Sequence, residues 1–165
     1  MIREVQLADA KTYLDLMEAL DQESTYMLFE PGERKQTQPE FENLLNEFIT
    51  SQNKVLFVAE EEGVLVGFVE VNGEDLRRIR HRADLIIGIR EAYQGSGLGK
   101  ALIAQAIEWS KSNDIKRLEL TVITTNKKAL WLFSRMGFSV EGTRRKSRFV
   151  ENQWCDEFYM SLLFM

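Results

Sequence analysis

Hydrophobic residues recur at helical spacing in two segments near the N-terminus. The first predicted helix spans Ala8 to Leu20, with Asp9 as a candidate N-cap. The second begins at Pro39, because proline is favoured in the first turn of a helix. Between them, the polar residues 30–40 hold both prolines of the chain, which indicates a long loop or a helix break. The pattern therefore predicts two helices that flank a mobile loop.

Two further helices are predicted in the second half of the chain. Residues 97–112 place leucine, alanine and tryptophan on one stripe and charged residues on another, as in an amphipathic helix. A shorter helix begins at Lys127, after Asn126 as a candidate N-cap. It stops at Gly137, because glycine readily adopts the left-handed conformation found at helix ends.

Runs rich in β-branched and aromatic residues alternate with these helices. The first two runs are joined by Glu-Glu-Gly at residues 61–63 and are interpreted as a hairpin. Strands alternate with helices in the middle of the chain but come as hairpins at both ends. The class is therefore mixed α/β with a partly antiparallel sheet. The predicted strands are two runs within residues 54–73, followed by residues 82–90, 117–123, 138–145 and 153–164.

Composition and charge narrow the classes of function. The chain has 165 residues, a hydrophobic content of 44% and a net charge of −5, and its pI is about 5.1. We expect one domain over residues 1–165. An acidic protein suits a cationic substrate better than a phosphate backbone, so no nucleic-acid partner is expected. No apolar run reaches the ~20 residues of a membrane span, which predicts a soluble cytoplasmic protein without a membrane partner.

The single cysteine and the single histidine limit metal and redox chemistry. One cysteine excludes an intrachain disulfide, and the lack of clustered ligands argues against a zinc site, so no metal is expected. Cys155 is interpreted as a packed strand residue rather than a nucleophile, because His81 is far away in the sequence. The basic residues 77–82 are either a solvated turn or a ligand site.

The chemically most informative stretch runs from Gln94 to Lys100, between a predicted strand and a predicted helix. Its three alternating glycines let the backbone approach a ligand, and the helix start favours an anion, most naturally a phosphate. A Walker A loop does not fit, because only three residues separate Gly95 from Gly99 and Ala101 stands where a Ser or Thr is needed. A dinucleotide fingerprint needs a third glycine at the position of Lys100. A phosphorylated cofactor of another kind is predicted.

The spacing that fits is Q/R-x-x-G-x-G/A, and with it the chain resembles the GCN5-related N-acetyltransferase (GNAT) family. The resemblance covers nearly everything from Lys54 to the C-terminus. It rests on ADLIIGI, YQGSGLGKALI, RLELTVI and NKKALWLFSRMGF, the last of which is similar to the family's N-x-x-A-x-x-L-[YF]-x-x-x-G-F. The chain looks most like bacterial spermidine and ribosomal-protein acetyltransferase-like groups. The family implies about seven mostly antiparallel strands, splayed between the fourth and fifth, about four helices, and acetyl-CoA as cosubstrate.

The resemblance also implies residues that hold the cosubstrate. The pantetheine arm of acetyl-CoA would pair with the backbone of Ile87, Gly88 and Ile89 as an added strand. Asn126 would lie near the pantetheine or the sulfur, would only cap its helix, or would do both. Phe133, in the position of a family tyrosine, would lie beside the same arm. The residues expected around the pyrophosphate are Gln94, Gly95, Ser96, Gly97, Leu98, Gly99 and Lys100.

In this family the amine attacks the thioester directly, without an acyl-enzyme. A backbone N–H of the splayed strand, around Ile87 to Ile89, would hold the oxyanion. The amine arrives largely protonated at neutral pH, so a group must accept its proton. The candidate catalytic residues are Asp84 and Glu70, with His81 as a third possibility, and each has an alternative interpretation as an ordinary charge on a sheet.

The departing thiolate is usually protonated by a tyrosine in the position that Phe133 occupies here. A thiol of pKa about 8.5 that leaves unprotonated at pH 7 forfeits only ~2 kcal/mol, so loss of the acid is tolerable. Water, Tyr26, Tyr93 or Tyr159 would replace it, and the sequence does not choose among them. Phe133 also leaves open a non-catalytic protein that binds acetyl-CoA as a sensor or interaction module.

Acceptor specificity is expected from the two N-terminal helices and the loop between them. Acids and aromatics there suit a polyamine or a protein or peptide amine, although a polar mobile loop is an equal interpretation. Lys127 and Lys128 lie in the first turn of their predicted helix, where the helix dipole disfavours cations. Two interpretations remain: one of them meets a coenzyme A phosphate, or both are simply exposed to solvent. The apolar C-terminal strand makes a homodimer plausible. The candidate acceptor residues are Asp21, Glu23, Tyr26, Phe29 and Glu30.

Overall fold

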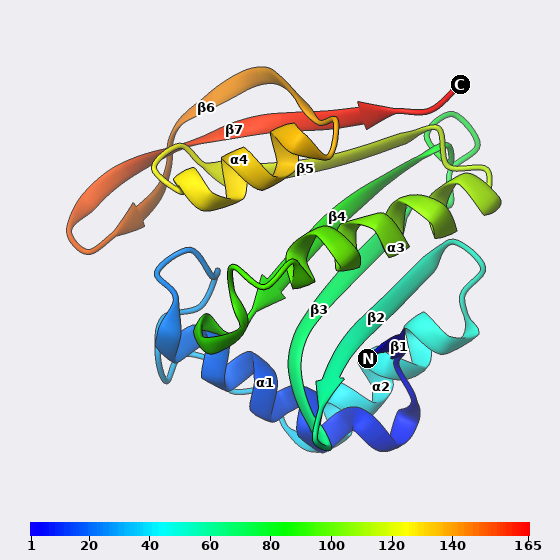
Figure 1. Cartoon of the computed structure of the whole chain (residues 1–165), viewed down its shortest axis with the longest axis vertical. Helices are drawn as coiled ribbons and strands as arrows, with labels where there is room; N and C mark the ends of the chain where they lie inside the picture. Colours follow the sequence, from blue (N-terminus) through cyan, green and yellow to red (C-terminus); the bar gives the residue numbers. More distant parts are fainter.

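The strand-forming runs assemble into one seven-stranded sheet with the order β1-β2-β3-β4-β5-β7-β6 (Figure 1). The computed structural model describes residues 1–165. The mixed α/β class predicted from the sequence is confirmed. The strands are β1 (Ile2–Glu4), β2 (Lys54–Glu61), β3 (Val64–Gly73), β4 (Arg82–Ile89), β5 (Arg117–Ile123), β6 (Ser139–Val150) and β7 (Gln153–Leu163).

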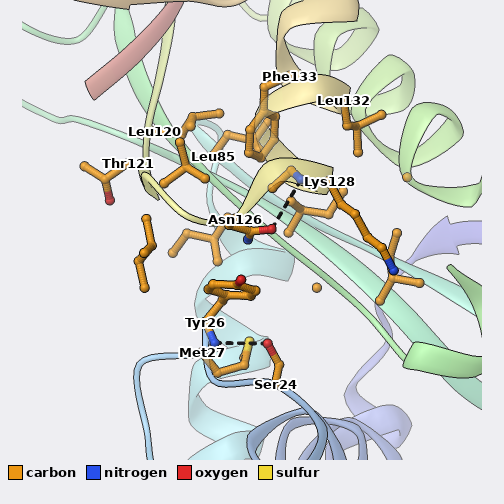
Figure 2. Close-up of a pocket in the computed structure, with 18 of the residues that line it drawn as sticks. Ser24, Tyr26, Met27, Leu85, Leu120, Thr121, Asn126, Lys128, Leu132 and Phe133 are labelled. Carbon is orange, nitrogen blue, oxygen red and sulfur yellow. Dashed lines mark hydrogen bonds between the residues drawn. The ribbon is translucent and has the colours of Figure 1, made fainter. Parts of the chain in front are cut away.

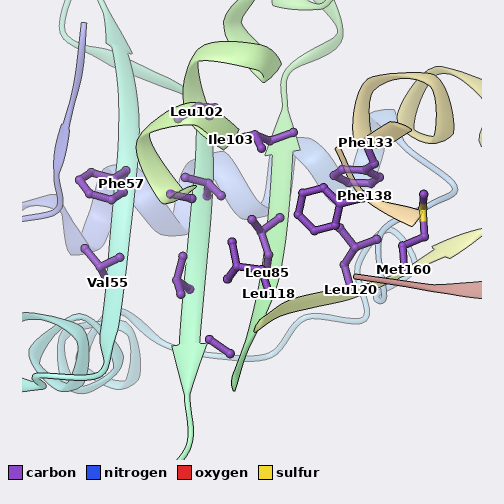
Figure 3. Packing of buried hydrophobic residues seen from close by; sticks show 14 of the residues in the cluster. Val55, Phe57, Leu85, Leu102, Ile103, Leu118, Leu120, Phe133, Phe138 and Met160 are labelled. Atoms are coloured by element: carbon purple, nitrogen blue, oxygen red, sulfur yellow. The ribbon is translucent and has the colours of Figure 1, made fainter. Parts of the chain in front are cut away.

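Two helices cover each face of the sheet. α1 (Ala10–Glu23) and α2 (Gln38–Thr50) pack on one face of β2 and β3, where Tyr13, Phe41 and Phe68 share a buried cluster. α3 (Leu98–Ser112) and α4 (Lys127–Arg135) lie on the other face, over a larger cluster that Figure 3 draws from β2 to β7. No helix is long and apolar enough to cross a membrane.

The junction of β4 and β5 is the one parallel pairing in the sheet. It is limited to Arg82–Asp84 of β4 against Arg117–Glu119 of β5. Beyond those residues both strands continue without pairing to each other, so they diverge (Figure 1). This confirms the splayed sheet that the family resemblance implies, and it places a gap at the carboxyl ends of the two strands.

The helix starts are where local sequence signals and structure differ most. Asp9 does stand at the N-cap of α1, but its side chain does not cap the helix. Its carboxylate instead accepts from the guanidinium of Arg3 at 2.8 and 2.9 Å and from the N–H of Gln6 at 2.7 Å. The second helix begins at Gln38, one residue before Pro39, because Thr37 provides the N-cap.

Thr37 and Glu40 form a reciprocal capping box at the start of α2. The Thr37 hydroxyl accepts from the N–H of Glu40 at 3.4 Å, and the Glu40 carboxylate accepts from the N–H of Thr37 at 3.0 Å. We expect Thr37→Ala to lower the free energy of unfolding by about 1 kcal/mol, because a helix N–H loses its partner. Urea unfolding followed by circular dichroism checks this, and an unchanged midpoint would contradict it.

Candidate active site

A cleft of about 2060 Å³ occupies the divergence of β4 and β5. The strands β3, β4 and β5 and part of β7 contribute to its walls. The other walls are the end of α1 with the segment after it, the start of α3, and α4. The cleft therefore passes through the sheet and reaches from the α3–α4 face to the α1 face, so two ligands can meet in it from opposite sides.

The edge of β4 supplies free backbone groups to this cleft. The N–H of Arg90 donates to the carbonyl of Val66 on β3 at 2.9 Å. Because backbone groups alternate in direction along a strand, those of Ile87 and Ile89 point away from β3 and toward the gap, whereas those of Gly88 point toward β3. Gly88 contributes space instead, since a Cβ there would lie 2.6 Å from a ring carbon of Phe68.

The turn after β4 has the geometry of an anion cradle. Gly95 and Gly97 adopt φ values of +78° and +88°, which glycine tolerates and side chains do not. Gly97 is the N-cap of α3 and provides no side-chain cap, so the N–H groups of the first helical turn remain available. Gly99 lets α4 approach, because a Cβ there would lie 2.8 Å from a methyl of Leu132.

Most of the predicted pyrophosphate residues lie on the cleft wall. Gln94, Gly95, Gly97, Gly99 and Lys100 line it, and the Gln94 side-chain amide donates to the carbonyl of Ile89 at 3.1 Å.

Two other predicted residues of this turn are not on the wall. The Ser96 hydroxyl closes the turn by donating to the carbonyl of Tyr93 at 2.7 Å. Leu98 packs against the hydrophobic core.

α4 borders the opposite side of the cleft (Figure 2). The Asn126 side-chain oxygen accepts from the N–H of Ala129 at 3.3 Å, so its predicted capping role is confirmed. Phe133 lines the cleft but is 5% exposed and packs against Phe138, with the two rings tilted and their centroids 5.8 Å apart. Lys127 and Lys128 are also on the wall.

Two carboxylates face the cleft on the α1 side of the sheet. Glu70 of β3 accepts from the hydroxyl of Tyr13 at 3.0 Å and from the amide of Asn72 at 3.2 Å. Burial raises the pKa of Glu70. The pKa of Asp84 is also raised, first by burial and then by the charge of Glu119. His81 does not line the cleft.

The predicted acceptor residues separate into two groups. Tyr26 and Phe29 line the cleft, whereas Glu30 does not. Glu23 also lines it, but its carboxylate is engaged with the guanidinium of Arg90 at 2.7 Å and the N–H of Glu91 at 2.8 Å. This carboxylate therefore ties the end of α1 to the end of β4.

The loop between α1 and α2 is anchored by a buried ion pair. Asp21 accepts two hydrogen bonds from Arg34, at 2.7 and 3.1 Å, and their side chains are 3% and 7% exposed. The same guanidinium lies 4.4 Å from the ring centroid of Phe29. Asp21 is therefore a structural partner of the loop, not a free acid in the cleft.

Arg148 of β6 is a cleft residue that the sequence reasoning missed. Its guanidinium donates to the carbonyls of Tyr26 at 3.2 Å and Met27 at 3.3 Å, and so holds the segment after α1 across the gap. Tyr13, which orients Glu70, was missed as well. No local signal could have found either contact, because the partners are far apart in the sequence.

The open edge of β4 and the start of α3 without a side-chain cap are the features that the resemblance to the acetyltransferases implies. The family model described as "Acetyltransferase (GNAT) family" matches residues 15–138. The chain therefore belongs to this family, which confirms the resemblance seen in the sequence, and its enzyme class is that of the N-acetyltransferases.

The curated relatives of this chain are named for different acceptor amines. The L-amino acid N-acetyltransferase AaaT of Escherichia coli is 30% identical over 104 residues, which cover 61% of this chain and 62% of that protein. The chain thus spans just under two thirds of that relative. The spermidine N(1)-acetyltransferase of Escherichia coli is 29% identical over 136 residues, covering 82% of this chain and 72% of that protein.

Solved structures share the fold over almost the whole chain. An acetyltransferase of the GNAT family from Streptococcus pneumoniae is 31% identical, with a TM-score of 0.96 and 99% coverage of both chains. An acetyltransferase from Salmonella typhimurium, solved with acetyl-CoA, has a TM-score of 0.87 at 18% identity and covers 99% of this chain and 92% of that one. This second likeness concerns the fold alone.

Proposed function

We propose that this protein transfers an acetyl group from acetyl-CoA to a primary amine by direct attack within a ternary complex. The observation that carries the proposal is the unpaired edge of β4 running into the left-handed glycines at the start of α3. An extended amide-containing arm fits the strand edge, and a diphosphate fits the helix start.

The residues present fit this cosubstrate. Ile87 offers a backbone donor and acceptor to an added strand and Ile89 a backbone donor, while Gly95 and Gly97 leave open space where side chains would stand. When bound, acetyl-CoA supplies an activated thioester carbonyl. The N–H of Ile87 is directed toward the gap and is the proposed donor to the oxygen on which negative charge develops.

Glu70 is the proposed proton acceptor for the amine. It is half-buried, oriented by Tyr13 and Asn72, and its raised pKa brings it closer to that of a base working near neutral pH. Asp84 lies on the same side of the sheet but is more exposed, and we propose that it attracts the cationic amine.

The residues on the α1 side of the cleft indicate which class of amine accepts the acetyl group. Tyr26 lines the same cleft as the carboxylates of Glu70 and Asp84, a combination suited to an ammonium group, whereas the ring of Phe29 already contacts the guanidinium of Arg34. Relatives named for spermidine and for L-amino acids support small amines, and a protein or peptide N-terminus is a further candidate.

A thiol-release assay with a panel of amines tests the proposal. The panel contains spermidine, L-amino acids and alanine-terminated peptides, and isothermal calorimetry measures binding of acetyl-CoA in parallel. Binding together with amine-dependent thiol release is expected. Binding of acetyl-CoA without thiol release for any amine would instead favour a sensor or interaction module. The observation that supports this second candidate is the phenyl ring of Phe133 in the cleft, at the position of the family's tyrosine. Absence of binding would refute the proposal altogether.

The lysines at the start of α4 provide a separate prediction. We expect the double change Lys127→Gln and Lys128→Gln to weaken acetyl-CoA binding roughly 2- to 5-fold, because one exposed cation–phosphate contact is lost. The salt dependence of the dissociation constant should fall too. The control changes Lys54 and Lys111 to Gln, which alters net charge equally away from the cleft. Equal affinities for both double variants would contradict the prediction.

A further inference from the structure

The proposed transfer is faster when the departing sulfur receives a proton, and the position on α4 where the family has a tyrosine does not provide a hydroxyl. Phe133 has no hydroxyl and is packed against Phe138. The side chain of Asn126 is occupied in part by capping. A tyrosine that protonates the sulfur must therefore come from another wall of the cleft.

Four tyrosines are present in the chain, and their positions differ sharply. Tyr13 is fully buried and donates to Glu70. Tyr93 does not line the cleft. Tyr26 and Tyr159 do line it, so the choice lies between these two.

Tyr159 is separated from the gap by a strand. It lies on β7 opposite Thr121 of β5, so β5 stands between its backbone and β4. The guanidinium of Arg144 lies 5.4 Å from the centroid of its ring. The hydroxyl of Tyr159 makes no hydrogen bond within the chain that would direct it to the gap.

Tyr26 crosses the gap itself. Its chain segment leaves α1, which Glu23 ties to the end of β4, and its hydroxyl donates to the carbonyl of Thr125 in the turn between β5 and α4 at 3.4 Å. Figure 2 places the Tyr26 ring beneath Asn126, on the opposite side of the cleft from Phe133. A 3.4 Å bond is long for a hydroxyl donor, so this proton can be redirected to a ligand atom.

The backbone of Tyr26 is held at two points. Its N–H donates to the hydroxyl of Ser24 at 3.1 Å. Its carbonyl and that of Met27 accept from one nitrogen of Arg148. The phenol is thus positioned by contacts to α1, to the turn after β5 and to β6, although the residue is 41% exposed.

We propose that Tyr26 is the catalytic acid of the transfer and that Arg148 is its positioning residue; this inference rests on the proposed function. Glu70 first takes one proton from the ammonium group and passes it to solvent. The freed amine nitrogen then forms a bond to the carbonyl carbon and loses a second proton to Glu70. The carbon–sulfur bond breaks, its electron pair remains on sulfur, and the phenol of Tyr26 protonates that sulfur. The phenolate then regains a proton from solvent, and Glu70 releases one to solvent.

Steady-state kinetics of Tyr26→Phe, with the fastest amine of the panel, test the assignment. We expect kcat to fall roughly 10- to 100-fold, because an unprotonated thiolate must leave. The calorimetric dissociation constant for acetyl-CoA should change less than two-fold. Tyr93→Phe is the matched control, and it should retain the parent kcat.

A double-mutant cycle tests the role of Arg148. We expect Arg148→Gln to lower kcat in the parent protein but to have no further effect on kcat in the Tyr26→Phe background, since its effect acts through the phenol. Fully additive losses, or a Tyr26→Phe kcat within two-fold of the parent, would overturn the inference. A parent protein that releases no thiol with any amine would instead refute the proposed function, which keeps the two failures apart.

Discussion

Replacement of Glu70 by Gln is expected to lower kcat roughly 10²- to 10⁴-fold, the range of a lost general base. Gln keeps the size of the side chain and its hydrogen-bonding capacity toward Tyr13, but it cannot accept a proton from the amine. Burial raises the pKa of Glu70, so the charged carboxylate costs stability at neutral pH. Removing that charge should not destabilise the fold, and a loss of activity will not reflect unfolding.

The pH dependence provides an independent check on the same residue. Glu70 can accept a proton only as a carboxylate, so kcat/KM should fall as the pH drops through its pKa. Because that pKa is raised, the fall should begin at a higher pH than an ordinary glutamate would cause. In Glu70→Gln this acidic limb should be absent from the pH profile of kcat/KM.

Asp84→Asn is the comparison that can reverse the assignment. Asp84 lies on the same side of the sheet but is more exposed, and no side chain donates a hydrogen bond to it. Its replacement should raise KM for a cationic amine more than it lowers kcat. A larger kcat loss for Asp84→Asn than for Glu70→Gln would make Asp84 the base.

Replacement of Gly97 by Val is expected to weaken acetyl-CoA binding roughly 100- to 1000-fold. The φ of +88° at Gly97 is strained for valine, and relaxation of the turn would withdraw N–H groups from the anion site. This range corresponds to about two lost charge-assisted hydrogen bonds at ~1.5–2 kcal/mol each. Calorimetry with acetyl-CoA measures it.

Gly63→Val is a matched control for this variant. Gly63 has a φ of +80° in the turn between β2 and β3, and a Cβ at Gly63, like one at Gly97, would meet no atom within 4 Å. Both variants should lose similar free energy of unfolding, but only Gly97→Val should lose affinity. Equal affinity in the two variants would refute the anion site at the start of α3.

The bounds of single strands, helices and turns were predictable from the sequence because residues close together in the chain determine them. The strand over residues 117–123 and the helix that begins at Lys127 agree with the predicted bounds. The glycine-rich turn at the start of α3 was also predicted in the right place, since positive φ values are a property of a short run of residues; its role in anion binding stays a prediction. The exception was Asp9, whose side chain binds Arg3 instead of capping α1.

The acceptor side of the cleft was less predictable than the turn. Tyr26 and Phe29 were identified as candidates from composition, and they do line the cleft. Glu23 and Asp21 were candidates on the same grounds, but arginines from other parts of the chain engage both carboxylates. A sequence pattern reveals the charge of a side chain, not whether a partner neutralises it.

By itself, the sequence determined the family, the order of the helices and strands from α1 onward, and the glycine-rich turn at the start of α3; it did not reveal the short strand β1. Only the tertiary structure decided which carboxylate is oriented by Tyr13, how far β4 and β5 remain paired, and that Arg148 holds the segment of Tyr26 across the gap. The physical reason is distance along the chain. Periodicity and capping act within a few residues, whereas these contacts join strands and loops whose register is set only when the whole sheet and its helices pack.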